Sequence, residues 1–315
     1  MSALVAKLVL ATGIDQSSVR RIMLSAPRRY KSYYIAKRNG GLRKISQPAR
    51  EVKVLQRALI DLLLSDLPVH RTAMAYRVGT SIKDNANAHK TSGPIIKIDF
   101  TNFFPSIKRS DWADYCQKTG CLNDPTEIGL TSSLLFQYQK EHASQRLAIG
   151  APSSPMLSNI LMYEFDSEIE SRLQGTRIVY TRYADDLTFS APRTGYLHDV
   201  MKIVRETMRA IPYPRLKINP DKTTYVTTKY RRSVTGLTLS NDGRVTIGWR
   251  KKRELHAAVH NAKLDKLNAK GLQALAGYLA FVQSVEPSFL SVLRNKYGTE
   301  IIMKIKAANV KKALR

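Results

Sequence analysis

Cysteine is scarce in this sequence: only Cys116 and Cys121 occur among 315 residues. A disulfide framework or a zinc cluster needs more thiols, so both are expected to be free thiols in a reducing, cytoplasmic protein. Long apolar runs are also missing, because none reaches the roughly 18 residues that a membrane span requires. The first 15 residues are too short, and end in the wrong residues, for a secretory signal. These absences predict a protein without a membrane partner.

Acidic residues are few relative to basic ones. The chain has 25 Asp and Glu against 51 Lys and Arg, which gives a net charge of +26 spread along its length. A globular protein this basic usually binds a polyanion, and nucleic acid is the first expectation; the alternative is a surface that is merely cationic. His256 and His260 have the spacing of metal ligands, but no nearby Cys or acidic pair completes a zinc site, which favours a solvated basic helix face.

The expected elements alternate between helices and strands. Short helices precede a hairpin that turns at Asn39-Gly40-Gly41, a strong turn signal. A second turn is expected at Asn219-Pro220-Asp221, and Ser154 is the expected N-cap of a helix with Pro155 at its first position. The apolar face of that helix is Leu157, Leu161, Phe165, Ile169 and Leu173. Other expected elements are a helix over 51–66, a strand over 95–100, helices over 109–140, a strand pair around 180–190, a helix over 197–211 and helices from 249 onward. This order predicts an α+β fold with helices on one face of an antiparallel sheet.

Two neighbouring carboxylates, Asp185 and Asp186, stand in the stretch YTRYADDLTFS, whose flanks have strand composition. A third, Asp99, ends the apolar strand Ile95-Ile96-Lys97-Ile98, where a carboxylate is costly unless it is paired or bound to a cation. If the two segments lie side by side, the three carboxylates offer the oxygen ligands that Mg²⁺ prefers. Two such ions would stabilise the attacking and leaving oxygens of a phosphoryl displacement. The alternative is an Asp pair that only decorates a turn.

These residues resemble the motifs of reverse transcriptases. Tyr183-Ala184-Asp185-Asp186 resembles the active-site box of the family, Asp99 with Phe103-Phe104 resembles its first acidic motif, and the segment 150–155 (GAPSSP) resembles its template-and-nucleotide loop. Two further features resemble bacterial retron reverse transcriptases: the segment 85–89 (NANAH) and the triplet 234–236 (VTG). The resemblance covers most of the chain, from about residue 30 onward.

The resemblance implies roles for the acidic site. Asp99, Asp185 and Asp186, with the backbone carbonyl of Phe100, would hold two Mg²⁺ ions, for which Mn²⁺ could substitute. Lys222 matches a lysine that protonates the departing pyrophosphate, although it could also be an ordinary turn lysine.

Nucleotide-binding residues are implied in the same way. Phe104 would lie beneath the incoming sugar and reject a ribose 2′-OH, unless it is only a core residue. Gly150 and Ala151 would let the backbone approach the template, and Lys37 and Arg43 would hold the triphosphate, unless their hairpin is merely solvated. Many relatives have Gln where Ile149 stands, so a hydrogen bond from that Gln cannot be transferred.

The remaining implied residues concern RNA and primer. In retron enzymes the region of Asn85 and His89 is tied to recognition of the enzyme's own RNA, although both could be polar core residues. The triplet Val234, Thr235 and Gly236 would grip the primer end. Basic residues at the start of the C-terminal helices would contact duplex phosphates: Arg250, Lys251 and Arg253.

The implied architecture is a right-hand polymerase with an antiparallel-sheet palm and a mainly helical thumb. Its expected parts are fingers with N-terminal helices at 1–92, palm at 93–108, a helical insertion at 109–148, palm at 149–236 and thumb at 237–315. The implied activity is RNA-directed DNA polymerisation, a nucleotidyl transfer from deoxynucleoside triphosphates. Retron enzymes copy a structured noncoding RNA from one of its own 2′-OH groups into a branched RNA–DNA product (msDNA), often with an effector protein in phage defence. The alternatives are another minimal reverse transcriptase, an RNA-templated RNA polymerase, or a catalytically idle RNA-binding scaffold that restrains a partner effector.

Overall fold

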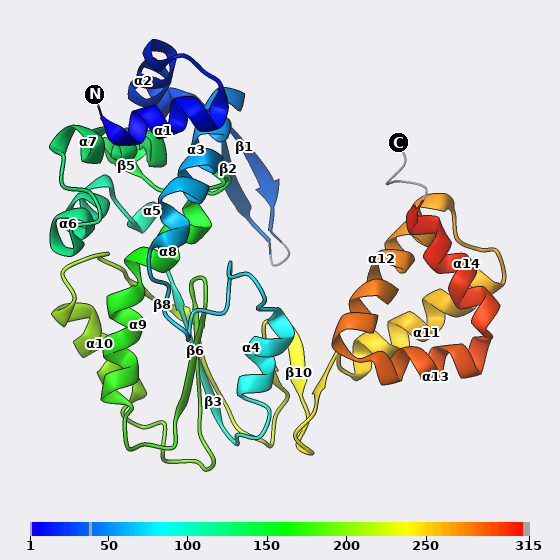
Figure 1. The fold of residues 1–315 in the computed structure, drawn as a ribbon. Coiled ribbons are helices and arrows are strands. Elements are labelled where there is room, and N and C mark those ends of the chain that lie inside the picture. Colours follow the sequence, from blue (N-terminus) through cyan, green and yellow to red (C-terminus); the bar gives the residue numbers. More distant parts are fainter. Residues whose placement is uncertain (1, 38–39, 311–315) are drawn as a thin grey trace. The chain divides into compact units, whose positions relative to one another are not determined.

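The computed structural model describes residues 2–37 and 40–310, and the chain forms two compact units (Figure 1). The described residues of 1–80, 96–191 and 195–225 form the first unit, and those of 81–95, 192–194 and 226–315 form the second. The hydrophobic cores follow this division, since the two large clusters of buried apolar side chains each belong to one unit.

The first unit begins with helices and one hairpin. Helices α1 (Ala3–Thr12), α2 (Gln16–Ser25) and α3 (Arg50–Leu62) share one core, with the 3₁₀ turns η1 (Ala26–Arg28) and η2 (Leu64–Asp66) at their ends. Strands β1 (Tyr30–Ala36) and β2 (Leu42–Pro48) pair antiparallel, as the sequence predicted. Of the predicted turn, Asn39 lies outside the described residues, while Gly40 and Gly41 have φ of 84° and 78°, a conformation that favours glycine.

A four-stranded sheet forms the centre of the first unit, in the order β6-β7-β3-β8. Its strands are β3 (Ile95–Phe100), β6 (Val179–Tyr183), β7 (Asp186–Ser190) and β8 (Ile218–Val226). Helices α9 (Tyr163–Arg172) and α10 (Val200–Ala210) lie along one side of this sheet, and their apolar side chains share a core with those of β3 and β7 (Figure 1). The predicted α+β architecture is confirmed.

The predicted turn at Asn219-Pro220-Asp221 is wrong, because all three residues lie inside β8. Proline signals a turn mainly because it cannot donate a ladder hydrogen bond. β8 is an edge strand of the sheet, however, and an edge strand has one row of N–H groups that need no partner strand.

The predicted helix starting at Ser154 is also corrected. Helix α8 (Ser154–Leu161) follows Ser153 as its N-cap residue, so Ser154 is the first helical residue and Pro155 the second. The backbone ψ of 1° at Met162 interrupts the helical conformation, and α9 begins after it. The five apolar residues predicted to share one face are buried in one core across both helices.

The insertion between β3 and α8 is less helical than expected. It contains α5 (Phe103–Ser106), α6 (Arg109–Thr119) and α7 (Pro125–Leu135), but then a short hairpin of β4 (Gln137–Gln139) and β5 (Ser144–Arg146) around the 3₁₀ turn η3 (Lys140–His142). The hairpin replaces the last predicted helical turn, and its strands are only three residues long, too short for a sequence period to reveal.

The second unit contains α4 (Ile82–Ala88), a three-stranded sheet and four C-terminal helices. The sheet has the order β11-β10-β9, with β9 (Arg232–Val234), β10 (Leu237–Leu239) and β11 (Val245–Thr246). The helices are α11 (Trp249–Lys263), α12 (Ala269–Val285), α13 (Pro287–Tyr297) and α14 (Thr299–Val310), whose apolar sides form the second core. The prediction of helices from Trp249 onward is confirmed.

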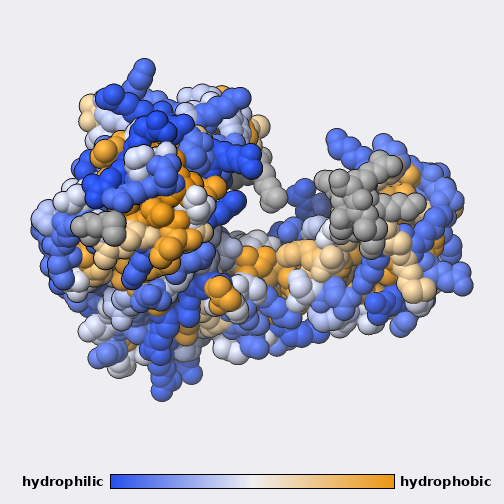
Figure 2. Space-filling model, turned by 45° about the horizontal axis from the view of Figure 1, so that its top comes forward, coloured by the Kyte–Doolittle hydropathy of each residue, from blue (hydrophilic) through white to orange (hydrophobic). Residues whose placement is uncertain are grey.

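The surface is consistent with the composition. Hydrophilic residues cover most of the face seen in Figure 2, with apolar side chains in limited patches. No helix among the described residues is both long and apolar enough to cross a membrane.

Candidate active site

The Asp pair lies at the tip of the β6–β7 hairpin. Tyr183 pairs with Asp186, so Ala184 and Asp185 form a two-residue turn. Ala184 has φ of 57°, a left-handed conformation that two-residue hairpin turns require and that is uncommon outside glycine. This tight turn holds Asp185 and Asp186 at the end of the sheet.

Asp99 lies beside this turn. The N–H of Phe100 donates to the carbonyl of Asp185 at 3.2 Å, which ties the end of β3 to the hairpin tip. The N–H of Thr101 donates to the carbonyl of Lys217, just before β8 begins, at 2.8 Å. The three acidic residues therefore meet at one edge of the four-stranded sheet, although Asp185 is 86 positions from Asp99 in the sequence.

A lysine partly neutralises these carboxylates. The Nζ of Lys222 lies 3.0 Å from both carboxylate oxygens of Asp99, and the side-chain amide of Asn219 donates to one of them at 3.3 Å. The hydrogen bond to Asp99 raises the pKa of Lys222, so the lysine is held in its charged form. Both residues belong to β8, which pairs with β3, the strand that carries Asp99. Because the segment Asn219-Pro220-Asp221 is part of this strand and not a turn, Asn219 and Lys222 can contact Asp99.

Lys222 does not fully neutralise the negative charge of Asp185 and Asp186. The surrounding protein partly desolvates Asp186, and together with the charges of Asp185 and Asp99 this raises the pKa of Asp186 to about 6. Desolvation, followed by the charge of Asp99, also raises the pKa of Asp185, while Lys222 and Arg43 oppose that rise. Crowded carboxylates with raised pKa values mark a place where added positive charge would be stabilising.

The carboxylates of the acidic cluster suit a divalent cation, but their side chains are not arranged as a complete set of metal ligands. Across residues 2–37 and 40–310, no three His, Cys, Asp or Glu side chains already have the arrangement of a metal site. Asp99 faces Lys222 instead, whose side chain is 61% exposed and has room to turn away into solvent. Carboxylate and carbonyl oxygens are the ligands of hard divalent ions, and the mutual repulsion of the three acids is what such ions would relieve.

A buried ion pair supports the hairpin from below. Arg182 and Asp166, both 0% exposed, form a two-pronged pair with N–O distances of 2.6–3.1 Å. Arg182 Nη1 also donates to the Ala184 carbonyl at 3.2 Å and to Asn159 at 3.1 Å. Burial alone would lower the pKa of Arg182, but the Asp166 carboxylate raises it, so the guanidinium stays charged. The ion pair thus connects α9 to the turn that carries Asp185.

This ion pair was not predicted from the sequence. The signal was present in YTRYADD, where an arginine interrupts a strand of apolar and aromatic residues, and a buried arginine requires an acidic partner. Its partner Asp166 lies between Phe165 and Ile169, two residues of the predicted apolar helix face, and no local signal marks it as a buried acid.

Two aromatic rings lie near the acidic edge. Phe104 is half-buried, and its ring centroid is 6.3 Å from that of Tyr76 and 5.5 Å from that of Phe103. Tyr76 has φ of 60° and is 47% exposed, and burial together with the charge of Asp185 raises the pKa of its hydroxyl. Phe103 is buried in the core whereas Phe104 is not, so the two neighbouring rings occupy different environments.

The loop after β5 is tied to the first hairpin. The N–H of Ser46 donates to the carbonyl of Ile149 at 2.8 Å. A Cβ on Gly150, whose φ is 120°, would lie 2.9 Å from the Ser46 carbonyl oxygen and 3.1 Å from the Ile45 side chain. The close approach that requires glycine here is therefore to β2. Ala151 is buried next to it.

The basic hairpin residues differ in their relation to the acidic edge. Lys37 and Arg43 are both exposed. The charge of Arg43 acts on Asp185 and on Tyr76, where it opposes the rise in the pKa of each group. Lys37 donates its backbone N–H to Gly41 and thereby closes the hairpin.

The predicted RNA and primer residues lie in the second unit. Asn85 and His89 are 1% and 0% exposed, and burial lowers the pKa of His89 to about 4, so its ring is neutral near pH 7. Thr235 and Gly236, with φ of 47° and 80°, form the two-residue turn between β9 and β10, and this left-handed conformation favours the glycine at position 236. Burial favours the polar-core alternative for Asn85 and His89.

The basic start of α11 is accessible. The side chain of Arg250 is 82% exposed beside Glu254, and the guanidinium of Arg253 lies 4.5 Å from the ring centroid of Trp249, which is 70% exposed. Lys251 is half-buried on the same turn. This surface combines positive charge with an exposed aromatic ring.

Comparisons with known proteins show which family and fold this chain resembles. Residues 35–255 match the family model described as reverse transcriptase (RNA-dependent DNA polymerase). The retron Ec83 reverse transcriptase of Escherichia coli is 36% identical over 279 residues, covering 88% of this chain and 89% of that protein. The retron Ec73 reverse transcriptase of Escherichia coli is 31% identical, covering 89% and 90%. Among solved structures, telomerase from Candida albicans in complex with the TWJ fragment of telomeric RNA matches with a TM-score of 0.52 at 13% identity, over 91% of this chain and 56% of that one, which is a likeness of fold.

Proposed function

This chain belongs to the reverse transcriptases, as one of the bacterial retron enzymes with RNA-directed DNA polymerase activity, and we propose that it copies a structured noncoding RNA into a short DNA. In this proposal the first nucleotide is joined to a 2′-OH of that RNA, which yields a branched RNA–DNA product (msDNA), and the product serves phage defence together with an effector protein. The net charge of +26 supports a nucleic-acid partner. The likeness to retron enzymes over nearly the whole chain supports the retron type.

The observation that carries the proposal is the contact between Phe100 and Asp185, which brings three carboxylates to one edge of the palm. Asp99, Asp185 and Asp186, with the carbonyl of Phe100, would hold two Mg²⁺ ions, or Mn²⁺ in their place. When bound, these ions would stabilise the attacking and leaving oxygens of nucleotidyl transfer. Asn219 would keep the Asp99 carboxylate oriented, and Arg182 would hold the turn that presents Asp185.

Lys222 would act at two stages. Before substrate binds it neutralises Asp99, which limits repulsion within the acidic cluster. Once displaced from Asp99, the protonated amine would donate a proton to the departing pyrophosphate, a form of help typically worth about 10²–10⁴ in rate. Its exposed side chain supports such a movement.

The incoming deoxynucleoside triphosphate would lie between the hairpin β1–β2 and the acidic edge. Arg43, whose charge already reaches Asp185, and Lys37 would hold the phosphates. Gly150 and Ala151 would form the floor of the nucleotide site, in a loop that is anchored to β2. Phe104 would lie beneath the sugar.

Replacing Phe104 with Ala is expected to admit ribonucleotides. If the ring clashes with a 2′-OH at a cost of about 1–3 kcal/mol, its removal should lower discrimination against ribonucleoside triphosphates by about 5- to 160-fold. The measurement is kcat/KM for a deoxynucleotide and the matching ribonucleotide on one primed RNA template.

The neighbouring ring supplies the control for this variant. Phe103→Leu alters the buried ring next to it and should lower stability without changing sugar discrimination. Unchanged discrimination in Phe104→Ala would contradict the steric role and leave Phe104 as a packing residue.

Primer and duplex would be bound by the second unit. The turn Val234-Thr235-Gly236 would contact the primer end, and Arg250, Lys251 and Arg253 would contact phosphates without reading sequence. Asn85 and His89 are buried, so they would support the structure around α4 instead of contacting RNA directly. In this proposal fingers, palm, insertion and thumb correspond to 1–92, 93–108 with 149–236, 109–148 and 237–315.

The retron proposal is tested by the nucleic acid that copurifies with the protein. After expression together with its neighbouring genomic sequence, we expect a short DNA joined to RNA through a branch that resists ribonuclease at one nucleotide. Sequencing this species would identify the RNA and the branch point. Recovery of bulk ribosomal RNA alone would overturn the retron proposal while leaving the polymerase activity untouched.

A further inference from the structure

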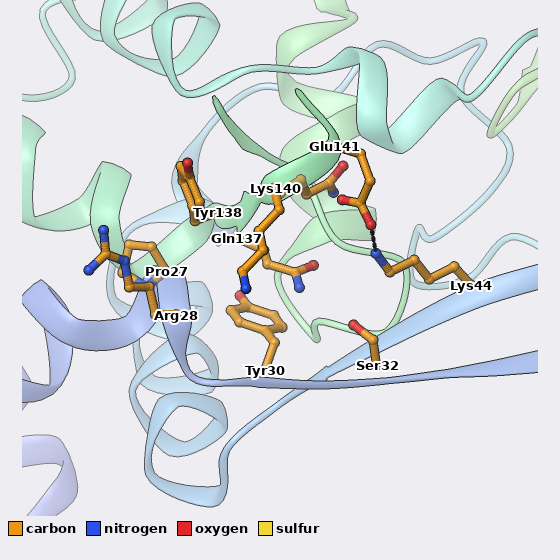
Figure 3. A pocket seen from close by; sticks show the side chains of 10 residues that line it. Pro27, Arg28, Tyr30, Ser32, Lys44, Gln137, Tyr138, Lys140 and Glu141 are labelled. Carbon is orange, nitrogen blue, oxygen red and sulfur yellow. Dashed lines mark hydrogen bonds and ion pairs between the residues drawn. The ribbon is translucent and has the colours of Figure 1, made fainter. Parts of the chain in front are cut away.

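A cavity of about 520 Å³ opens in the first unit between the two hairpins β1–β2 and β4–β5 (Figure 3). This volume lies within the range of about 300–1,000 Å³ that is common for small-ligand sites. The first hairpin and η1 provide Pro27, Arg28, Tyr30, Ser32 and Lys44, and the second provides Gln137, Tyr138, Gln139, Lys140 and Glu141. None of these residues has a role in the site described above.

The cavity contains a buried polar group without a partner. Gln137 is 7% exposed, and its side-chain oxygen is buried and accepts no hydrogen bond from any described residue. Figure 3 shows this amide pointing from β4 into the cavity toward the side chains of β1. A buried amide oxygen left unpaired is costly, which suggests that a ligand with a donor completes it.

The charge of the cavity is positive. Of the three cations in its wall, Lys44 pairs with Glu141, the single carboxylate there. Neither Arg28 nor Lys140 forms an ion pair within residues 2–37 and 40–310. Two cations without acidic partners suit a phosphate group.

Aromatic rings complete the wall. The guanidinium of Arg28 lies 5.6 Å from the ring centroid of Tyr138, and the hydroxyl of Tyr30 accepts a hydrogen bond from Gln56 at 3.0 Å. Burial raises the pKa of Tyr30 to about 12, so this hydroxyl keeps its proton as a donor. Aromatic and guanidinium faces stack on nucleobases, and an amide can pair with a base edge.

The cavity adjoins the strand that anchors the 150–155 loop. Ser32 in the cavity wall and Ser46 lie opposite each other with their hydroxyl oxygens 2.9 Å apart, and Ser46 bonds Ile149 just before that loop. The cavity is therefore one strand away from the loop at which the template is expected.

From these contacts we propose that the cavity binds one unstacked nucleotide of the unpaired RNA template. The inference rests on the proposed function, because it assigns a place to RNA that has not yet entered the duplex. Gln137 contacts the base edge, Tyr138 and Arg28 stack on the base, and Lys140 contacts the neighbouring phosphate. A peptide with acidic side chains would satisfy the cations but would leave the aromatic faces unused.

The test compares primed RNA templates with single-stranded 5′ overhangs of zero to eight nucleotides. Wild-type affinity is expected to rise by about tenfold once the overhang is long enough to reach the cavity, and Gln137→Leu or Tyr138→Ala should abolish that gain. Lys140→Gln should lower the salt slope of overhang binding by about one. Lys202→Gln, an exposed lysine on α10, is the matched control for charge.

Two readouts separate this proposal from a loss of folding or of polymerase activity. The blunt-ended duplex should bind all variants as tightly as wild type, and each variant should still extend a primer on a short overhang. Gln137→Leu should also be at least as stable as wild type, because the substitution removes an unpaired buried amide. Absence of synthesis by the wild-type enzyme would count against the proposed function, not against the cavity.

Three outcomes would overturn the cavity proposal. The first is an overhang gain that persists in Gln137→Leu and in Tyr138→Ala. The second is a loss of blunt-duplex affinity in Lys140→Gln as large as its loss of overhang affinity, which would show that Lys140 only attracts nucleic acid in general. The third is binding of free ATP or dATP that competes with the overhang at micromolar concentration, which would make the cavity a mononucleotide site.

Discussion

Replacing Asp185 with Asn is expected to lower DNA synthesis by about 10³-fold, because it removes one negative oxygen from the ligand set proposed for the divalent ions. A loss of that size corresponds to about 4 kcal/mol of transition-state stabilisation, within the several kcal/mol attributed to metal catalysis. The fold should survive, since Asn has the same shape and Asp185 is only half-buried. The measurement is single-nucleotide extension of a primed RNA template over a range of Mg²⁺ concentrations.

The controls for this prediction use other acidic residues of the first unit. Asp199→Asn removes an exposed carboxylate before α10 and should leave synthesis unchanged. Asp99→Asn should match the loss in Asp185→Asn and should also release Lys222 from its partner. Synthesis at the wild-type rate in Asp185→Asn would remove the metal assignment and would favour an RNA-binding scaffold.

Replacing Arg182 with Met is expected to destabilise the first unit by about 3–5 kcal/mol, because it leaves the carboxylate of Asp166 buried without its partner. The same change removes the hydrogen bond to the Ala184 carbonyl, so the turn should hold the side chain of Asp185 less firmly in position. We expect urea unfolding to shift to lower concentration, and synthesis at low temperature to fall more than the folded fraction does.

A double variant tests whether the ion pair causes this loss. Arg182→Met combined with Asp166→Leu removes both charges, and should cost clearly less than the sum of the two single changes. Arg182→Lys retains the charge but not the two-pronged geometry, and should lie between wild type and Arg182→Met. Additive single costs would indicate that the two residues contribute independently.

The sequence predicted best those elements whose structure depends on residues that are close together in the chain. The hairpin of β1 and β2, the strand β3 and the basic helices from Trp249 follow from turn residues and periodicity, and the structure has all of them. Local signals failed at Pro220, because a proline forbids a central strand but not an edge strand, and strand order is not a local property. They failed at β4 and β5 because three-residue strands carry no measurable period.

The candidate site also has residues that the sequence identified and contacts that only the structure showed. The motifs around Asp99 and Asp185 identified the acidic residues and, by resemblance, the kind of reaction. They did not indicate that Asp166 and Arg182 would form a buried pair beneath the turn, or that Gly150 is required by contact with β2. Asn219 and Tyr76 were likewise missed as neighbours of the acids.

Composition and local order alone predicted a basic α+β protein whose strands end in acidic residues, because charge, periodicity and turn chemistry depend on residues close together in the chain. The folded structure was needed to show that Lys222, 123 positions from Asp99, neutralises it, and that two hairpins enclose a cavity with an unpaired amide. Such contacts depend on burial and chain closure between distant segments, and their free energy is distributed over the whole core rather than over any single stretch of sequence.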